Sequence, residues 1–353
     1  MVRNLCHARR LSSQSLAEKV RKTKQQTFSL GERVVTIEDI EKAFAVIHPV
    51  VHKTPLLSSC TFNGTTDNNV FFKAENFQRT GAFKLRGAYN KISSLTSEER
   101  KRGVIAHSSG NHAQGVAYAS AMFGIKAVIV MPENSVKSKV TATQSYGAEV
   151  VFCGNTTDDR ERTTQELIDR SGYTLIHPYN DEKLIAGQGT VALEIFRERD
   201  DLDYLFVPVG GGGLISGCAV AAKSFSTKVK VIGVETEGAN DCFQSFHAKK
   251  LIKLKSVNTI ADGMRTLSVG TLNFEIIMKY VYDVVTIRDE DLIPMMRFFL
   301  ERMKILVEPT GAVAAAAVAK NVLGLRKKNI CAVISGGNVD MEMVRKVSEE
   351  VRA

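Results

Sequence analysis

The chain has 353 residues, of which 44% are hydrophobic and 24% are charged. This is the composition of an ordinary folded protein with a sizeable core and room for more than one domain. No uninterrupted apolar run approaches the ~20 residues that a membrane-spanning helix needs, so we expect no membrane partner. The net charge of +9 is concentrated at the N-terminus, where residues 1–35 hold eight Lys or Arg against two acidic residues. Because the remaining body is nearly neutral, binding to nucleic acid is not expected.

Residues 1–34 are expected to form a basic tail outside the folded body. The first sixteen residues contain Arg, Ser and His but neither Asp nor Glu, which is typical of a mitochondrial transit peptide and equally of a plain basic tail. We expect a cytoplasmic protein, with a mitochondrial location as the alternative if this segment is a transit peptide. None of the six cysteines belongs to a C-x-x-C pair. A zinc knuckle is therefore excluded, and a disulfide framework is not expected.

Short apolar runs alternate with helical patterns from Val104 onward. Continuous apolar strands between helices are typical of a parallel sheet that helices cover on both faces. The fold class is therefore α/β, built from open twisted sheets. The pattern predicts helices over residues 111–124 and 210–225, and strands over residues 103–109, 126–132, 148–153, 204–209, 230–235 and 329–335.

Three polar segments that contain glycine follow predicted strands, at residues 107–112, 209–214 and 335–338. In open α/β sheets, ligands bind outside the carboxyl ends of the strands. The three segments therefore predict one site that is assembled from distant parts of the chain.

A run of four glycines joins a predicted strand to a predicted helix: Gly210, Gly211, Gly212 and Gly213. Without Cβ atoms, the backbone can approach an anion closely and direct several N–H groups at it, and the helix adds the positive end of its dipole. The run predicts a phosphate site, and the alternative is that these glycines form a flexible turn. It matches neither the ATP-binding nor the dinucleotide-binding glycine pattern.

The segment FQRTGAFKLRGAYN, residues 77–90, places Lys84 among small and apolar residues beside a glycine turn. Partial burial lowers the pKa of a lysine amine and makes the amine able to form an imine. The alternatives are a solvated surface lysine and a buried lysine in a salt bridge.

Five motifs occur in order along the chain: TGAFKLRGA, SSGNHAQGVAYA, GQGTVALEI, VPVGGGGLISG and SGGNVD. Together they resemble the fold-type II pyridoxal-phosphate enzymes, and within them the serine racemase and serine/threonine dehydratase group, over about residues 35–345. The resemblance implies two open twisted α/β domains with the active site in the cleft between them. A large domain would comprise residues 35–98 and 182–350, and a small domain residues 99–181. It also implies a small amino-acid substrate and a homodimer.

The resemblance implies a role for each motif residue. Lys84 would carry pyridoxal 5′-phosphate as a Schiff base and act as the base on one face of the substrate Cα. Ser335 would face the pyridine nitrogen, where a hydroxyl group makes the ring a weaker electron sink than a carboxylate would. The other cofactor contacts would be Phe83 beside the ring, Asn111 at the phenolic oxygen, and Gly210, Gly211, Gly212 and Gly213 at the phosphate. Ser108, Asn111 and His112, at a helix N-terminus, would receive the substrate carboxylate.

Ser109 would stand on the face of Cα opposite Lys84. Lys84 removes the proton from an L-substrate, and Ser109 can return one from the other side, which inverts the centre. If the β-hydroxyl group leaves instead, the products are a keto acid and ammonia. Two positioned proton-transfer groups contribute roughly 10²–10⁴-fold each. Ser109 could equally be a helix N-cap, and the two roles are compatible.

A second candidate site follows the strand predicted at 230–235. Glu235, Ala239 and Asp241 are spaced so that two carboxylates and one carbonyl could converge, and such oxygen ligands suit Mg²⁺ or Ca²⁺. Racemase-like members of the group carry a divalent cation at the matching positions. The alternative is an acidic surface loop.

The preferred substrate stays open. We favour a serine racemase with serine/threonine dehydratase activity, and the alternatives are a threonine dehydratase or a 3-hydroxyaspartate dehydratase without a racemase role. A second substrate carboxylate would need a cation, for which Arg160 is a candidate, although a solvated surface arginine is the simpler interpretation. Two departures from the group's pattern, Ala82 and Tyr179, weaken the racemase assignment more than the cofactor assignment. A non-catalytic α/β binding protein is disfavoured because Lys84 and the glycine run are both present.

Overall fold

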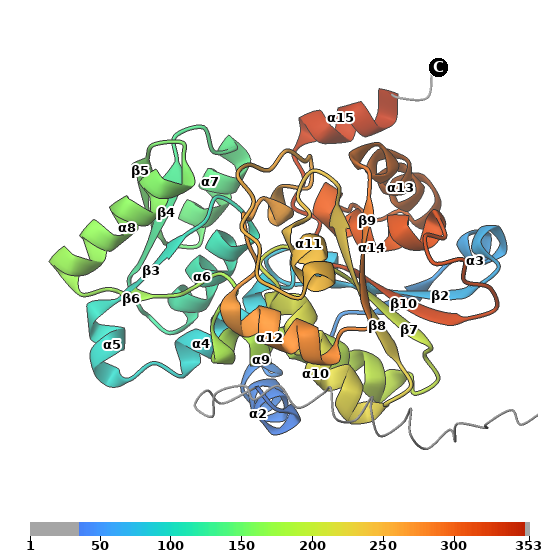
Figure 1. The fold of residues 1–353 in the computed structure, drawn as a ribbon. Helices are drawn as coiled ribbons and strands as arrows, with labels where there is room; N and C mark the ends of the chain where they lie inside the picture. The colour runs from blue at the N-terminus through green and yellow to red at the C-terminus, as the bar shows by residue number, and fades with distance from the viewer. Residues whose placement is uncertain (1–34, 350–353) are drawn as a thin grey trace, which may run out of the picture. The chain divides into compact units, whose positions relative to one another are not determined.

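The computed structural model describes residues 35–349, so the predicted basic tail and its targeting alternative lie outside the described residues. Figure 1 shows the arrangement of the elements. The strands are β1 (Leu56–Ser58), β2 (Asn69–Ala74), β3 (Val104–His107), β4 (Ala127–Pro132), β5 (Glu149–Cys153), β6 (Thr174–Leu175), β7 (Tyr204–Pro208), β8 (Lys230–Thr236), β9 (Asp283–Ile287) and β10 (Asn329–Ile334).

The helices connect these strands along one side or the other of each sheet. The α-helices are α2 (Ile37–Ile47), α3 (Cys60–Thr66), α4 (Lys84–Ser93), α5 (Ser97–Arg102), α6 (Asn111–Met122), α7 (Lys137–Ser145), α8 (Thr157–Ser171), α9 (Glu182–Glu198), α10 (Gly213–Phe225), α11 (Asp241–Ala248), α12 (Thr271–Tyr280), α13 (Leu292–Phe298), α14 (Pro309–Ala319) and α15 (Met341–Glu349). Short 3₁₀ segments are η1 (Glu75–Phe77), η2 (Asp262–Met264) and η3 (Asp289–Asp291), and η4 (Phe299–Met303) is a π-helical turn.

The strands form two sheets, one of six strands in the order β1-β2-β10-β7-β8-β9 and one of four in the order β5-β4-β3-β6. Neighbouring strands are parallel except for the edge pair β1 and β2. The α/β class and the predicted strands are therefore confirmed. Every strand of the four-stranded sheet lies within residues 104–175, inside the insert expected at 99–181. The division into a large and a small domain stays a prediction.

Strand β7 shows why the predicted strands read as unbroken apolar runs. Leu205 and Val207 pack in a core with α9 and α10, whereas Tyr204 and Phe206 pack in a second core with α13 and α14. Successive side chains of a strand point to opposite faces, so a sheet covered on both faces needs an apolar residue at every position. The four-stranded sheet follows the same rule, since Val104 and Ile105 belong to different cores.

Local signals set the starts of several helices. Thr36, Thr96 and Thr156 each precede a helix. The side-chain oxygen of each threonine accepts a hydrogen bond from the backbone N–H of the third helical residue, and the carboxylate of that residue accepts one from the threonine's own backbone N–H. Such capping boxes satisfy backbone N–H groups that have no partner within the helix. In the described part of the chain, no helix is both long enough and apolar enough to cross a membrane.

Candidate active site

The lysine segment and the segment after β10 lie against each other as a short two-stranded pairing. Phe83 N–H donates to the Ser335 carbonyl at 3.1 Å, and Gly337 N–H donates to the Gly81 carbonyl at 2.9 Å. Ala82 is fully buried between them and pairs with Gly336. A side chain larger than alanine has little room here, because a Cβ on Gly336 would already lie 3.0 Å from that of Ala82. Residues about 250 positions apart in the sequence thus share one wall.

Lys84 is the first residue of α4 and is partly buried. Its Nζ donates to the Pro178 carbonyl at 2.8 Å and lies 5.3 Å from the centre of the Phe83 ring. Burial lowers the pKa of Lys84 to about 8, and among the described residues no carboxylate forms an ion pair with it. The salt-bridged alternative for this lysine is therefore not observed. An amine in this state is available for attachment to a carbonyl compound near neutral pH.

The adjacent buried charge, Arg86, anchors α4 beneath the site. Its guanidinium group donates to Glu75 at 2.8 Å and to Glu194 at 2.7 Å, and Lys73 reaches Glu194 at 2.6 Å. All four side chains are at most 3% exposed. A buried charge is tolerated only when it is paired and hydrogen-bonded, so this cluster holds the start of α4 in one place.

The four glycines form a cradle in which three of them lie too close to neighbours for any side chain. A Cβ on Gly211 would overlap the ring of Tyr179, and one on Gly212 would lie 2.8 Å from Asn273. Gly212 also has φ +92°, which favours glycine. Asn273 Nδ2 donates to the Gly211 carbonyl at 2.9 Å and so supports the cradle from behind. The run is a closely packed loop at the start of α10.

Ser335 lies at the end of β10 and is 2% exposed. Its hydroxyl oxygen has no hydrogen-bond partner among the described residues. A buried hydroxyl group without a partner is costly, so a ligand atom that accepts or donates a hydrogen bond would stabilise it. This orphaned group, the cradle and the Lys84 amine with its lowered pKa fit the nitrogen, phosphate and aldehyde of pyridoxal phosphate.

The loop after β3 leads into α6, whose N-cap residue is Gly110 without a side-chain cap. Ser108 Oγ accepts from Gly110 N–H at 3.3 Å, and Ser109 does not cap the helix. The N-cap alternative for Ser109 is therefore wrong. A Cβ on Gly115 would lie 3.1 Å from the backbone of both Lys84 and Leu85, so α6 packs directly on the start of α4. The second turn of α6 thus lies against the start of α4.

Three histidines near Lys84 are held uncharged. Burial lowers the pKa of His112 well below its ordinary value, lowers that of His107, and lowers that of His177 to about 4. His177 Nδ1 accepts from the backbone of Asn180 at 2.8 Å, which fixes the turn that carries Pro178. The His112 ring contacts the Ile176 carbonyl at 2.9 Å, so this side chain is used within the protein. Its backbone position at the start of α6 remains suited to a carboxylate.

Asn111, the first residue of α6, contacts Glu308, which sequence reasoning missed, and Asn338, the last residue of the predicted segment 335–338. Asn111 Nδ2 donates to Glu308 Oε1 at 2.6 Å, and Asn111 Oδ1 accepts from Asn338 Nδ2 at 2.8 Å.

Arg160 is half-buried, and its charge joins burial in lowering the pKa of His107. A freely solvated surface arginine, the simpler interpretation of Arg160, is therefore not what the structure contains.

The predicted metal ligands lie between β8 and the start of α11: Glu235 belongs to β8, Ala239 to the following loop, and Asp241 is the first residue of α11. Glu235 accepts from the backbone N–H groups of Cys242 and Phe243 at 3.2 and 2.7 Å. Asp241 is fully buried, and neither of its carboxylate oxygens has a partner among the described residues. Burial raises the pKa of Asp241 to about 7, and burial together with Asp241 raises that of Glu235 well above its ordinary value. An acidic surface loop is excluded, and two buried carboxylates, of which Asp241 has no hydrogen-bond partner among the described residues, fit a cation.

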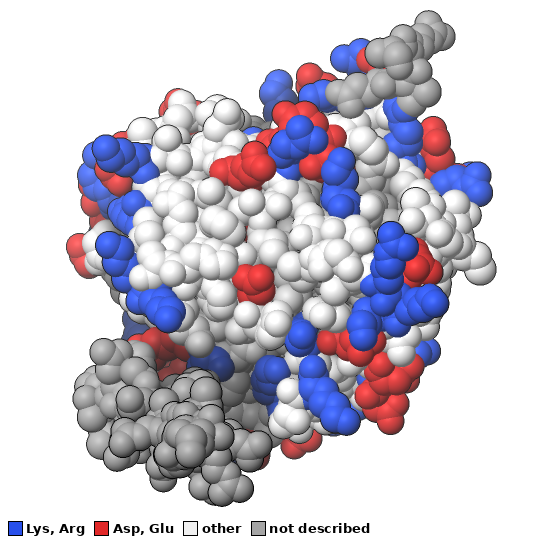
Figure 2. All heavy atoms as spheres, turned by 45° about the vertical axis from the view of Figure 1, so that its right-hand side comes forward, with Lys and Arg blue, Asp and Glu red and all other residues white. Residues whose placement is uncertain are grey.

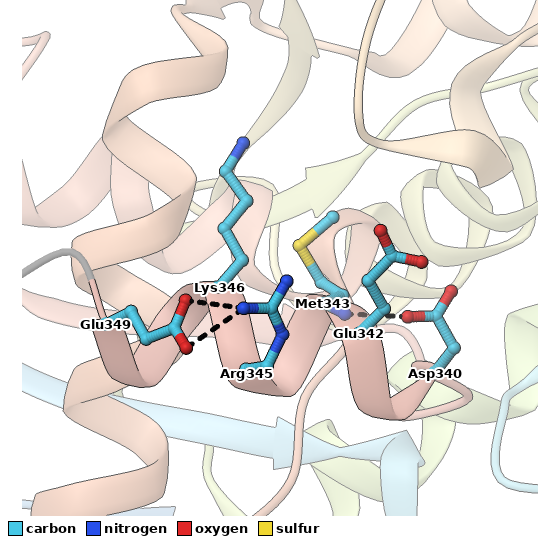
Figure 3. A pocket seen from close by; sticks show the side chains of 6 residues that line it. All are labelled: Asp340, Glu342, Met343, Arg345, Lys346 and Glu349. Atoms are coloured by element: carbon cyan, nitrogen blue, oxygen red, sulfur yellow. Dashed lines mark hydrogen bonds and ion pairs between the residues drawn. The ribbon is translucent and has the colours of Figure 1, made fainter.

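A separate hollow of about 400 Å³ runs along α15 (Figure 3). It is lined by one helix and the residue before it, with Arg345 paired to Glu349 at 2.9 Å and Met343 N–H donating to Asp340 at 2.7 Å. None of the predicted site residues lines it. These contacts stabilise the helix itself, so this hollow is not part of the candidate site.

The sequence of this chain is similar to that of known proteins. The model of the family "Pyridoxal-phosphate dependent enzyme" matches residues 47–336. The chain belongs to this family. Pyridoxal phosphate is therefore its cofactor, the assignment of an enzyme is confirmed, and the alternative of a non-catalytic binding protein is not supported.

The curated relatives carry different activities at nearly equal similarity. The chain is 46% identical to serine racemase of Schizosaccharomyces pombe, covering 87% of this chain and 95% of that protein. It is 45% identical to L-threo-3-hydroxyaspartate ammonia-lyase of Saccharomyces cerevisiae, covering 88% and 95%. It is 44% identical to L-threonine ammonia-lyase of Thermotoga maritima, covering 89% and 78%. The structure of maize serine racemase superposes with a TM-score of 0.86 at 38% identity, covering 90% and 98%.

Proposed function

We propose that this enzyme racemises serine and also eliminates the β-hydroxyl group of serine or threonine. The observation that carries the proposal is the Lys84 amine, which has a pKa of about 8 and no carboxylate partner among residues 35–349. The residue before Lys84, Phe83, is hydrogen-bonded through its backbone to Ser335, whose buried hydroxyl group has no partner among the described residues. The cofactor, when bound, withdraws electrons from the substrate Cα and so makes its proton acidic. The chain's own residues must then hold the substrate and move that proton.

Each group in the site suits one of these tasks. The N–H groups at the start of α6 suit a carboxylate, because they lack partners in the helix and carry the positive end of its dipole. Lys84 takes the Cα proton on one face, and the Ser109 hydroxyl, which caps no helix, serves the other. The uncharged histidines add no competing positive charge beside the amine. Two proton-transfer groups on opposite faces are what racemisation requires.

Arg160 supports a second candidate, a 3-hydroxyaspartate dehydratase. Its charge acts on both His107 and Tyr179, so it lies near the site, where it could pair with a second substrate carboxylate. One assay separates the candidates: purified enzyme is incubated with L-serine, L-threonine and threo-3-hydroxyaspartate, and keto acid, ammonia and D-amino acid are measured. D-serine with keto acid from serine supports the first proposal. Turnover of threo-3-hydroxyaspartate alone, without D-serine, supports the second.

A divalent cation bound by Glu235, Ala239 and Asp241 should stabilise the folded protein. A ligand that binds only the folded state contributes roughly 2.7 kcal/mol at a hundredfold excess over its Kd. We therefore expect a chelator to lower the melting temperature by several degrees, and Mg²⁺ or Ca²⁺ to restore it. Differential scanning calorimetry of wild type and Asp241→Ala measures this. Asp241→Ala should no longer respond to either treatment.

Asp289→Ala is the matched control for the cation. Asp289 accepts hydrogen bonds from Thr259 and Ile260 at 2.7 Å, so its removal should lower stability while the response to chelator persists. If wild type melts at the same temperature with and without chelator, the cation should be dropped.

We further propose that the substrate draws the predicted small domain, residues 99–181, onto the rest of the enzyme. The helix that suits the carboxylate, α6, belongs to this segment, whereas Lys84, the glycine run and Ser335 do not. Malonate should therefore slow hydrogen exchange over residues 107–120 and reduce the radius of gyration in small-angle scattering, as closing lids do. Tight malonate binding without either change would indicate a preformed site.

A homodimer and a cytoplasmic location complete the proposal. Figure 2 shows a broad area that is mostly uncharged, with an acidic group near its middle and most of the visible Lys, Arg, Asp and Glu around its margin. A low density of charged side chains is typical of interfaces between subunits. Sedimentation equilibrium of the purified protein tests the dimer, and fractionation of the source cells tests the location.

A further inference from the structure

Glu308 is a buried acid that the proposed proton transfers do not use. It precedes α14 and is 1% exposed. Its backbone N–H donates to the Gly336 carbonyl at 3.2 Å, beside the segment that carries Ser335. A Cβ on Gly336 would overlap Glu308 Oε1, so the glycine leaves the space that the carboxyl group occupies. The acid is thus built into the wall of the candidate site.

The side-chain amide of Asn111 lies between a hydrogen-bond acceptor, Glu308, and a hydrogen-bond donor, Asn338. Asn338 Nδ2 donates to the Thr80 carbonyl at 2.8 Å, which only its NH₂ group can do. The other hydrogen of the same NH₂ points to Asn111 Oδ1 at 2.8 Å. Asn111 must therefore turn its own NH₂ toward Glu308 Oε1, 2.6 Å away. One N–H of that group binds Glu308, and the second remains for a ligand.

An asparagine amide has nearly the same shape in its two orientations, so hydrogen-bond partners alone decide which one is adopted. Without Glu308, Asn111 would keep its contact with Asn338 but lose the partner of its NH₂ group. Its N–H would then be free to turn away from the cofactor. We propose that Glu308 is a positioning residue, whose carboxyl group, together with Asn338, presents an Asn111 N–H to the phenolic oxygen of pyridoxal phosphate. This inference rests on the proposed contact of Asn111 with the cofactor.

The charges around Glu308 favour its neutral form. Burial and Asp262 of η2 raise the pKa of Glu308 to about 8, against the opposing charge of Lys139 of α7. Lys139 forms an ion pair with Asp262, and the charge of Asp340 also acts to raise the pKa of Lys139. Glu308 Oε2 has no partner within residues 35–349, whereas Oε1 accepts from Asn111, so the proton belongs on Oε2. A neutral acid can fix Asn111 without placing a negative charge beside an anionic cofactor.

The test measures the dissociation constant for pyridoxal phosphate by absorbance in wild type, Glu308→Ala, Glu308→Gln and Asn338→Ala. Loss of a buried hydrogen bond costs about 1–3 kcal/mol, or roughly 5–150-fold in affinity. We expect this loss in Glu308→Ala and in Asn338→Ala. Glu308→Gln should bind like wild type at pH 7, because a glutamine oxygen also accepts from Asn111. If Glu308→Ala does not fold, Asn338→Ala and Glu308→Gln still carry the comparison.

The pH dependence distinguishes positioning from a merely structural role. As pH rises through about 8, Glu308 in wild type loses its proton and gains a charge, so the affinity of wild type should fall relative to that of Glu308→Gln. Titration of Lys84 affects both proteins alike and cancels in the ratio. Wild-type affinity in Glu308→Ala or Asn338→Ala, or an affinity in Glu308→Gln as low as in Glu308→Ala, would overturn the inference. If wild type itself binds no pyridoxal phosphate, the proposed function fails instead.

Discussion

A Lys84→Ala variant should lose both the yellow colour of the bound cofactor and all measurable turnover. Lys84 follows Phe83, which is hydrogen-bonded to Ser335, and burial lowers the pKa of Lys84 to about 8. Its removal takes away both the covalent attachment and the base, and a positioned base contributes roughly 10²–10⁴-fold alone. Absorbance of the purified protein and release of keto acid from L-serine measure the two losses. Borohydride should fix the cofactor onto the wild-type peptide that contains Lys84.

Lys223→Ala is a matched control for this variant. Lys223 also donates to a backbone carbonyl, that of Val229 at 2.7 Å, and burial lowers its pKa as well. It lies on α10 away from Ser335 and should matter only for stability. Lys84→Arg keeps a positive charge but cannot form an imine, so it should be as inactive as Lys84→Ala. Full activity in Lys84→Ala would contradict the central assignment, whatever the other variants do.

The parts of the site that were predictable from the sequence lie next to elements with a strong local signal. The strands β3, β7 and β10 are buried on both faces and therefore read as unbroken apolar runs. β7 and β10 are parallel neighbours, so their carboxyl ends meet at one edge of the six-stranded sheet, whereas β3 belongs to the four-stranded sheet. In both sheets the polar glycine-containing segments that follow these strands stand out in the sequence. Ser109 and Ser335 were candidates only through the family resemblance, because an isolated serine has no local signature.

The parts that the sequence did not reveal depend on partners far along the chain. Glu308 contacts Asn111 across 197 positions, and the sequence around either residue contains no pattern that predicts this contact. Asn273 supports the glycine cradle across 62 positions in the same way. Arg86 is fully buried and binds Glu194 across 108 positions. Such residues are found only once tertiary structure fixes which side chains share a wall.

A Ser109→Ala variant should separate the two reactions of the enzyme. An L-substrate presents its Cα proton to Lys84, so elimination from L-serine needs no group on the opposite face. Inversion does need one, and loss of that group should lower L-to-D conversion by roughly 10²–10⁴-fold. Elimination from L-serine should stay within the same order of magnitude. Chiral chromatography of the serine pool and a keto-acid assay follow both reactions in one reaction mixture.

The mirror-image substrate makes this test sharper. D-serine presents its Cα proton to the face of Ser109, so Ser109→Ala should lose elimination from D-serine as severely as it loses racemisation. A group that only shapes the loop would not distinguish the enantiomers. Ser108→Ala is the neighbouring control: its hydroxyl group accepts from Gly110 N–H at 3.3 Å, and its loss should change the reactions of both enantiomers in parallel. If Ser109→Ala slows L-serine and D-serine equally, Ser109 shapes the loop and the second proton donor must be sought elsewhere.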